Sequence, residues 1–152
     1  MTRWLGIDHG AKRIGVAAGD TSTGIAGPLA VLDGSQPLAM VLKEIISLAE
    51  DHHAAGIVVG WPLNMDDSEG PQGRLARQLA VEIAEASGLD VRLWDERLSS
   101  FEADQALAGQ LTRAKRRARQ DSIAAAMILQ DFLAQGGPES APTPADVHEG
   151  GS

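Results

Sequence analysis

Three carboxylate side chains stand where an apolar stretch of this chain ends or begins. Asp8 and Glu96 each follow a short apolar run, and Asp121 begins a stripe of apolar residues at helical spacing. A carboxylate that ends a buried strand or lies on the apolar face of a helix loses solvation. This loss is costly unless a cation or several hydrogen-bond donors compensate for it. Three such positions indicate a shared cation.

Each carboxylate also has a purely structural interpretation, which the sequence alone leaves open. Asp8 could accept backbone hydrogen bonds in a tight turn, and Glu96 could pair with Arg97 at the protein surface. Asp121 could cap the N-terminus of a helix. Asp95 and Glu96 point to opposite faces of one strand, so only one of them can join Asp8, and we favour Glu96.

The composition restricts the chemistry that such a site can use. The chain of 152 residues has no cysteine, which excludes disulfides and thiolate metal sites and favours hard cations bound by oxygen. It has no leader-like start and no apolar run near the roughly 20 residues that a membrane span needs, so we expect a cytoplasmic protein without a membrane partner.

The charge is unevenly distributed along the chain. A formal net charge of -8 argues against non-specific binding of nucleic acid, yet a short basic segment lies between Arg113 and Arg119. A local basic cluster can still meet phosphates, although a solvated loop is the alternative. Further phosphate or substrate contacts are predicted near Asp8 and in a polar loop. The candidates are Lys12, Arg13, Asn64, Arg97, Lys115, Arg116 and Arg117.

The hydrophobic periodicity predicts one mixed α/β domain over residues 1–135. Antiparallel hairpins are expected at one side of the sheet, and helix-linked crossovers at the other. Residues 136–152 have too little apolar surface to offset ordering, and we predict a disordered tail. The expected strands are near 3–8, 13–18, 24–32, 57–60 and 91–94, and the expected helices are near 36–53, 74–86, 99–107 and 121–134.

Four segments together resemble the motifs of the YqgF (RuvX) family, in the order in which that family has them. They span most of the predicted domain, which makes the resemblance specific. The chain departs from the family pattern at Trp61, at Asp66 and Asp67, and at Ser99 and Ser100. The four segments are Leu5 to Ala17, Val58 to Met65, Asp95 to Ser100 and Asp121 to Leu129.

The resemblance implies an RNase H-like fold, a mixed five-stranded sheet with helices on both faces. It also implies a metal-dependent bacterial nuclease that processes the 5′ end of pre-16S rRNA or resolves Holliday junctions. The acidic triad of the family carries over onto Asp8, Glu96 and Asp121. Two Mg²⁺ or Mn²⁺ ions bound there would serve the hydrolysis of a phosphodiester bond.

Two other classes of function remain as alternatives. Residues Gly6 to Gly10 also resemble the first phosphate loop of actin-like sugar kinases and chaperone ATPases, but those enzymes need two such domains and this chain has length for one. A non-catalytic RNA-binding or transcription-associated module is the second alternative. The sequence leaves open whether RNA or four-way DNA is the substrate, and whether the protein is a monomer or a dimer.

Overall fold

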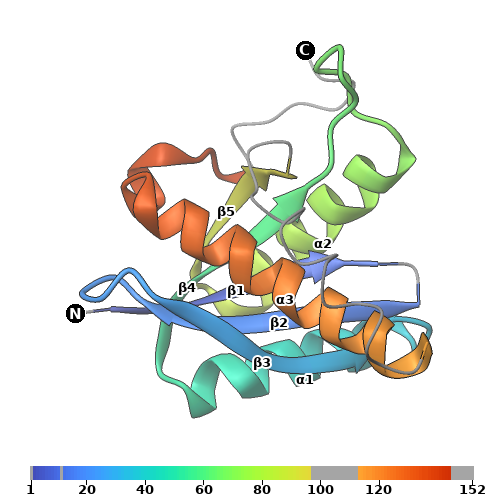
Figure 1. The fold of residues 1–152 in the computed structure, drawn as a ribbon, viewed down its shortest axis with the longest axis horizontal. Coiled ribbons are helices and arrows are strands. Elements are labelled where there is room, and N and C mark those ends of the chain that lie inside the picture. The colour runs from blue at the N-terminus through green and yellow to red at the C-terminus, as the bar shows by residue number, and fades with distance from the viewer. Residues whose placement is uncertain (1, 11, 97–112, 145–152) are drawn as a thin grey trace.

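The computed structural model describes residues 2–10, 12–96 and 113–144, and for 113–122 and 139–140 it describes the backbone only. The helix that the sequence predicts near 99–107 lies outside these residues. In chain order the elements are β1 (Arg3–His9), β2 (Arg13–Asp20), β3 (Ala26–Asp33), α1 (Leu38–Asp51), β4 (Ala54–Trp61), α2 (Pro71–Ser87), β5 (Asp90–Asp95), α3 (Arg113–Ala134) and a 3₁₀ helix (Gly137–Ser140) (Figure 1).

The five strands form one mixed sheet in the order β3-β2-β1-β4-β5. The three leading strands pair antiparallel, whereas β1 pairs parallel with β4, and β4 pairs parallel with β5. The parallel strands β1, β4 and β5 therefore end on the same side, which we call the carboxyl end of the sheet. Helix-linked crossovers place β4 in the middle of this parallel group, between β1 and β5.

Helices cover both faces of the sheet, so the predicted architecture is confirmed. One face carries α1 and α2, which pack on side chains such as Leu5, Ile7 and Val59. The other face carries α3, which packs on Trp4, Val58 and neighbouring side chains. Alternation along each strand sends successive residues to opposite faces, and this is why two separate apolar clusters sandwich the sheet.

Helix α3 lies very close to the middle of the sheet. A Cβ atom added at Gly6 would stand 2.8 Å from both the carbonyl oxygen of Ala125 and the Cβ of Leu129. Only a glycine in the strand permits this approach, because any side chain would push the helix away. The apolar stripe predicted to follow Asp121 is buried against the sheet, and it consists of Ala124, Ala125, Ile128, Leu129 and Phe132.

The start of α3 differs from the sequence prediction. The predicted start is near Asp121, but the helix begins at Arg113 and includes the basic segment. Asp121 therefore lies in the helix interior with about two turns before it, and its interpretation as an N-cap is wrong. The physical reason is composition: residues 113–120 contain no glycine or proline, and alanine, arginine, lysine and glutamine favour helix.

Residues 136–144, the described part of the predicted disordered tail, are ordered, whereas 145–152 lie outside the described residues. Gly137–Ser140 forms a 3₁₀ helix, Ala141 is buried, and the amide of Leu93 in β5 donates to the Pro142 carbonyl at 2.9 Å. Arg92 donates to the carbonyls of Pro138 and Ala141 at 2.8 and 2.9 Å. Backbone hydrogen bonds of this kind leave no hydrophobic pattern in the sequence, so composition alone missed them.

Across the described part of the chain, no helix combines the length and the apolar character that crossing a bilayer requires.

Candidate active site at the carboxyl end of the sheet

Asp8 lies near the end of β1 on the face that α3 covers. Its neighbour Ile7 is fully buried in the cluster on the other face, and alternation sends Asp8 toward the same side as Gly6. The side chain is half-buried. The carboxyl ends of strands in an open α/β sheet are where such folds bind ligands, so Asp8 lies at the expected place.

Glu96 follows β5 directly and lies over β4. A Cβ atom added at Gly60 would stand 2.5 Å from the Oε1 of Glu96 and 2.7 Å from the Cδ1 of Ile128. Ile128 belongs to α3, so the carboxylate of Glu96 is on the α3 face, as Asp8 is. The side chains of Asp8 and Glu96 are hydrogen-bonded to each other. The structure therefore brings these two predicted residues together.

The surroundings of Glu96 change its acidity strongly. Burial, the negative charge of Asp8, the hydrogen bond with Asp8 and the negative charge of Asp95 together raise the pKa of Glu96 to about 8. Two carboxyl groups at one site share a proton because both cannot ionise cheaply in contact. This pair can hold a proton near neutral pH, or it can exchange that proton for a cation.

Asp121 lies on α3, level with Asp8 along the sheet. The ring centroids of Trp4 and Phe132 are 5.0 Å apart, and Ala125 lies against Gly6, so α3 runs antiparallel to β1. Asp8 lies two strand residues beyond Gly6, which is about 7 Å along the sheet. Position 121 lies four helix residues before Ala125, which is about 6 Å in the same direction. The backbone at position 121 is therefore beside the end of β1 that carries Asp8.

The predicted substrate-binding residues divide into three groups. Exposed Lys12 lies in the turn between β1 and β2, and half-buried Arg13 is the first residue of β2. This turn is closed by a 2.9 Å hydrogen bond from the Gly10 amide to the Arg13 carbonyl. Asn64 is exposed on the loop after β4. These residues are at the carboxyl end of the sheet. The basic residues Lys115, Arg116 and Arg117 lie on the early turns of α3, and Arg97 is outside the described residues.

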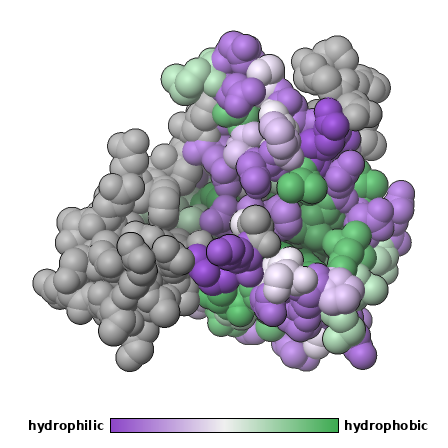
Figure 2. All heavy atoms as spheres, turned by 90° about the vertical axis from the view of Figure 1, so that its right-hand side faces the viewer, coloured by the Kyte–Doolittle hydropathy of each residue, from purple (hydrophilic) through white to green (hydrophobic). Residues whose placement is uncertain are grey.

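Hydrophilic side chains predominate at this end of the molecule. Figure 2 shows the side toward which β1 runs. Among the coloured residues, hydrophilic side chains cover most of this face, and hydrophobic side chains gather in its right-hand part. Among the side chains that the structure describes, no group of three or more acidic, histidine or cysteine residues is arranged to hold a metal ion. Of the three predicted acidic residues, the structure describes the side chains of Asp8 and Glu96, which are in contact, and the backbone of Asp121 beside them.

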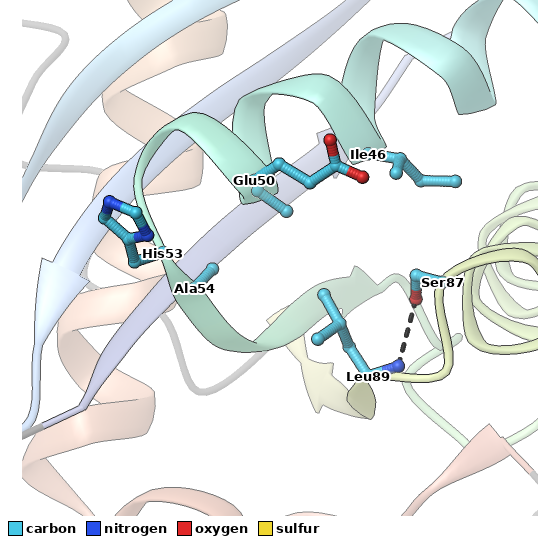
Figure 3. A pocket seen from close by; sticks show the side chains of 7 residues that line it. Ile46, Glu50, His53, Ala54, Ser87 and Leu89 are labelled. Atoms are coloured by element: carbon cyan, nitrogen blue, oxygen red, sulfur yellow. Dashed lines mark hydrogen bonds between the residues drawn. The ribbon is translucent and has the colours of Figure 1, made fainter.

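A pocket of about 300 Å³ lies elsewhere, between the C-terminal ends of α1 and α2. Ala54, the first residue of β4, lines it, whereas Gly60 near the other end of the same strand adjoins Glu96. Six strand residues span about 20 Å. Figure 3 shows Ile46 on α1 and Leu89 on the opposite side of the pocket, and the Leu89 amide donates to the Ser87 hydroxyl at 3.1 Å. This pocket is separate from the carboxylates.

Two features of the site were missed by sequence reasoning. The first is Gly60, whose missing side chain makes room for Glu96. The second is Glu69 in the loop after β4, which forms an ion pair with Arg77 of α2 at 2.9 Å. The sequence signals were Gly60 at the end of a predicted buried strand and Glu69 eight residues before Arg77. Neither pattern is distinctive until the fold brings the partners together.

The chain is similar to proteins of known family and fold. A family described as "Holliday junction resolvase", RuvX, matches residues 2–135. A "Putative pre-16S rRNA nuclease" of Opitutus terrae is 43% identical over 146 residues, which cover 95% of this chain and 99% of the relative. A protein with the same name from Anaeromyxobacter sp. (strain Fw109-5) is 45% identical over 132 residues, which cover 86% and 96%.

Solved structures with similar folds have lower sequence identity to this chain. T. thermophilus RuvC in complex with a Holliday junction substrate has a TM-score of 0.60 and 14% identity, with 93% of this chain and 98% of that chain covered. The large terminase nuclease of phage G20c with bound zinc has a TM-score of 0.50 and 19% identity, with 85% and 79% covered. These likenesses confirm the RNase H-like fold, and the sequence matches confirm the predicted family: the chain belongs to the RuvX family.

Proposed function

We propose that this protein is a metal-dependent endonuclease that hydrolyses phosphodiester bonds in nucleic acid. The observation that carries the proposal is the hydrogen-bonded pair of Asp8 and Glu96 at the carboxyl end of the sheet. The backbone of Asp121 lies beside them on α3. Folding holds these acids together at an electrostatic cost, and an arrangement that costs stability at a ligand-binding end of the sheet is typical of an active site.

The chemistry of these side chains fits a divalent cation. Both carboxyl groups are on one face, and burial together with the negative charge of Asp8 raises the pKa of Glu96. We propose Asp8, Glu96 and Asp121 as the ligands of two Mg²⁺ or Mn²⁺ ions, which are hard cations that prefer carboxylate oxygen. When bound, such ions supply charge stabilisation to the phosphoryl group and activate water for attack.

The protein residues would position the substrate around this centre. Lys12, Arg13 and Asn64 project from the turn and the loop at the same end of the sheet, where they would contact phosphates and sugars. We also propose substrate contacts for Arg97 and for the basic residues Lys115, Arg116 and Arg117. Binding through phosphates does not require a basic protein overall, because charges beyond about 10 Å are largely screened.

The proposed substrate is the 5′ end of pre-16S rRNA. This proposal rests on the names of relatives that are 43% and 45% identical to this chain. A four-way DNA junction is the second candidate, because the description of the matching family favours it. A junction resolvase cuts two symmetric strands and would most simply be a dimer, whereas an RNA processing nuclease has no such requirement.

The experiment that tests the function compares cleavage of a labelled pre-rRNA leader and a labelled four-way DNA junction at one salt concentration. Wild type, Asp121→Asn and the control Asp51→Asn should be assayed with Mn²⁺, Mg²⁺ or EDTA. Asp51 is an exposed residue at the end of α1. We expect metal-dependent cutting by wild type and Asp51→Asn only. Folded wild type that binds RNA without cutting it would instead favour the non-catalytic module.

A further inference from the structure

The loop that follows β4 is tied to α2 by a buried charged cluster. The Glu69 side chain is 1% exposed and the Arg77 side chain is 12% exposed. Arg77 donates from Nε to Oε2 of Glu69 at 2.9 Å and from a terminal nitrogen to Oε1 at 3.1 Å. The indole nitrogen of Trp61 donates to Oε2 at 2.9 Å. We call Trp61, Glu69 and Arg77 the loop clamp.

The ion pair between Glu69 and Arg77 is held in a fixed geometry. Burial of Glu69 would by itself raise the pKa of its carboxyl group, but the hydrogen bonds from Arg77 and Trp61 and the nearby positive charges lower it overall. A bidentate arginine-carboxylate contact restricts orientation as well as distance. Both carboxylate oxygens already accept hydrogen bonds, so Glu69 serves the loop and not a cation.

Further contacts hold the loop between the two ends of the clamp. Leu63 and Glu69 form an antiparallel bridge, which closes the loop at its base. Asn64 donates from its side-chain amide to the Ser68 hydroxyl at 2.9 Å, and the Ser68 amide donates to Asp66 at 3.0 Å. A loop with this many internal contacts is preorganised in one conformation.

The loop leaves the sheet between the two strands that carry the carboxylates. Strand β4 lies between β1 and β5, and Trp61 pairs with Asp95, the residue before Glu96. Trp61 packs on the face of α1 and α2, whereas Asp8 and Glu96 are on the face of α3. The clamp therefore lies behind the site and cannot touch the reacting atoms directly.

The tip of the loop exposes an apolar side chain. Met65 is 90% exposed and stands next to exposed Asn64. An ordered loop holds this side chain in one place, and methionine adapts its shape to irregular surfaces, so Met65 is suited to contact a partner. On a protein proposed to bind nucleic acid, the surface that Met65 would fit is the apolar face of a nucleobase.

We propose that Glu69 is a positioning residue: together with Trp61 and Arg77 it fixes the loop of residues 62–70, so that Asn64 and Met65 contact the nucleic acid strand held at the carboxylates. This inference rests on the proposed function. Its physical basis is entropy, because a loop that is ordered before binding does not have to be ordered by the substrate.

The test is a double-mutant cycle between the clamp and the tip. Wild type, Glu69→Gln, Met65→Ala and the double variant should be compared on the labelled RNA leader or the DNA junction, whichever wild type cuts faster. Glu82→Gln is the matched control, because Glu82 is an exposed residue on the same helix as Arg77. The readouts are KM, kcat, melting temperature and hydrogen exchange of the loop amides.

We expect each single variant to raise KM about tenfold with kcat changed less than about twofold, because binding is lost and chemistry is kept. Glu69→Gln alone should also accelerate exchange of the amides of residues 64–68. The KM of the double variant should be no higher than the larger of the two single-variant KM values, because Met65 is no longer held in place once the loop is mobile.

Three results would overturn the inference. They are variants with wild-type KM, additive losses in the double variant, and a fall in kcat at unchanged KM. Wild type that neither binds nor cuts any substrate would overturn the proposed function itself, and the inference with it. Trp61→Phe supplies a second, milder variant, because it removes one hydrogen bond to Glu69 and keeps an aromatic ring.

Discussion

Asp8 and Glu96 share a hydrogen bond although a whole strand, β4, separates the two strands that position them. The contact is possible because Gly60, level with Asp8 on β4, has no side chain between them. Neighbouring strands lie about 4.8 Å apart, so side chains on β1 and β5 are separated by about 10 Å of sheet. Glu96 spans this gap by lying over the glycine.

Replacement of Gly60 by alanine should therefore damage the site more than the fold. The new Cβ would stand 2.5 Å from the Oε1 of Glu96, so the carboxylate must move away from Asp8. We expect a loss of cleavage of about a hundredfold, the effect typical of a misplacement of about 1 Å, with a stability loss of about 1–3 kcal/mol. Initial rates and chemical denaturation measure the two effects.

Gly27→Ala is the matched control for this substitution. Gly27 is also a strand glycine, and no atom lies within 4 Å of a Cβ added there. It should retain wild-type cleavage. If Gly60→Ala cut as fast as Gly27→Ala, the close contact between Glu96 and Gly60 would have no role in activity.

The raised pKa of Glu96 predicts how stability depends on pH when divalent metal is absent. The folded protein keeps a proton on Glu96 up to about pH 8, whereas the unfolded chain releases it near 4.5. The folded state thus binds more protons in this window, and the unfolding free energy must fall as the pH rises from about 4.5 to 8. With about 1.4 kcal/mol for each pKa unit, the fall is of the order of a few kcal/mol.

Glu96→Gln should remove most of this dependence. In EDTA we expect the variant to match wild type near pH 4.5 and to be more stable than wild type at pH 8, as measured by urea denaturation at a series of pH values. Glu85→Gln, at an exposed position on α2, should follow the wild-type profile. Parallel profiles for wild type and Glu96→Gln would contradict the assigned burial and charge around Glu96.

Sequence reasoning located the site at positions where an acidic residue stands at the end of an apolar strand. An apolar run that ends in an acid predicts a carboxylate at a strand end. Asp8 follows this rule directly, whereas the apolar run near Glu96 ends in Asp95, one residue earlier. Alternation in a strand allows only one of Asp95 and Glu96 to join Asp8, and the structure pairs Glu96 with Asp8. The catalytic roles of these residues and of Asp121 stay predictions.

The features that sequence reasoning missed depend on close approach in three dimensions. Gly60 and Gly6 matter because other elements lie against them, which a one-dimensional pattern does not contain. The early start of α3 was missed because basic residues show no apolar period, although they favour helix. The order after Gly136 was missed because it rests on backbone carbonyls that bind Arg92.

Arg92 should be important for the order of the C-terminal segment. Its guanidinium binds the carbonyls of Pro138 and Ala141 and the carboxylate of Asp90. Arg92→Met keeps much of the side-chain length but leaves these acceptors without their donor, at a cost of about 1–3 kcal/mol. We expect a lower melting temperature and faster proteolysis after residue 136. Lys43→Met, at an exposed position on α1, should change neither.

Phe132 should anchor the end of α3 that is remote from Asp121. Its ring is fully buried, 5.0 Å from the Trp4 ring centroid and 6.1 Å from that of Trp94. Phe132→Ala would leave a cavity between two tryptophans, and we expect a loss of about 3–5 kcal/mol in unfolding free energy. A change in tryptophan emission should accompany it, because the packing around both indoles changes.

The control for this truncation is Leu75→Ala, which removes a large apolar side chain that is 44% exposed on α2. It should cost far less stability, because little apolar surface leaves the core. If Phe132→Ala cost no more than Leu75→Ala, the packing of α3 on β1 would not depend on this ring. A large loss would instead establish that the remote end of α3 holds the helix on the sheet. The position of Asp121 beside Asp8 would then depend on a contact about three helical turns away.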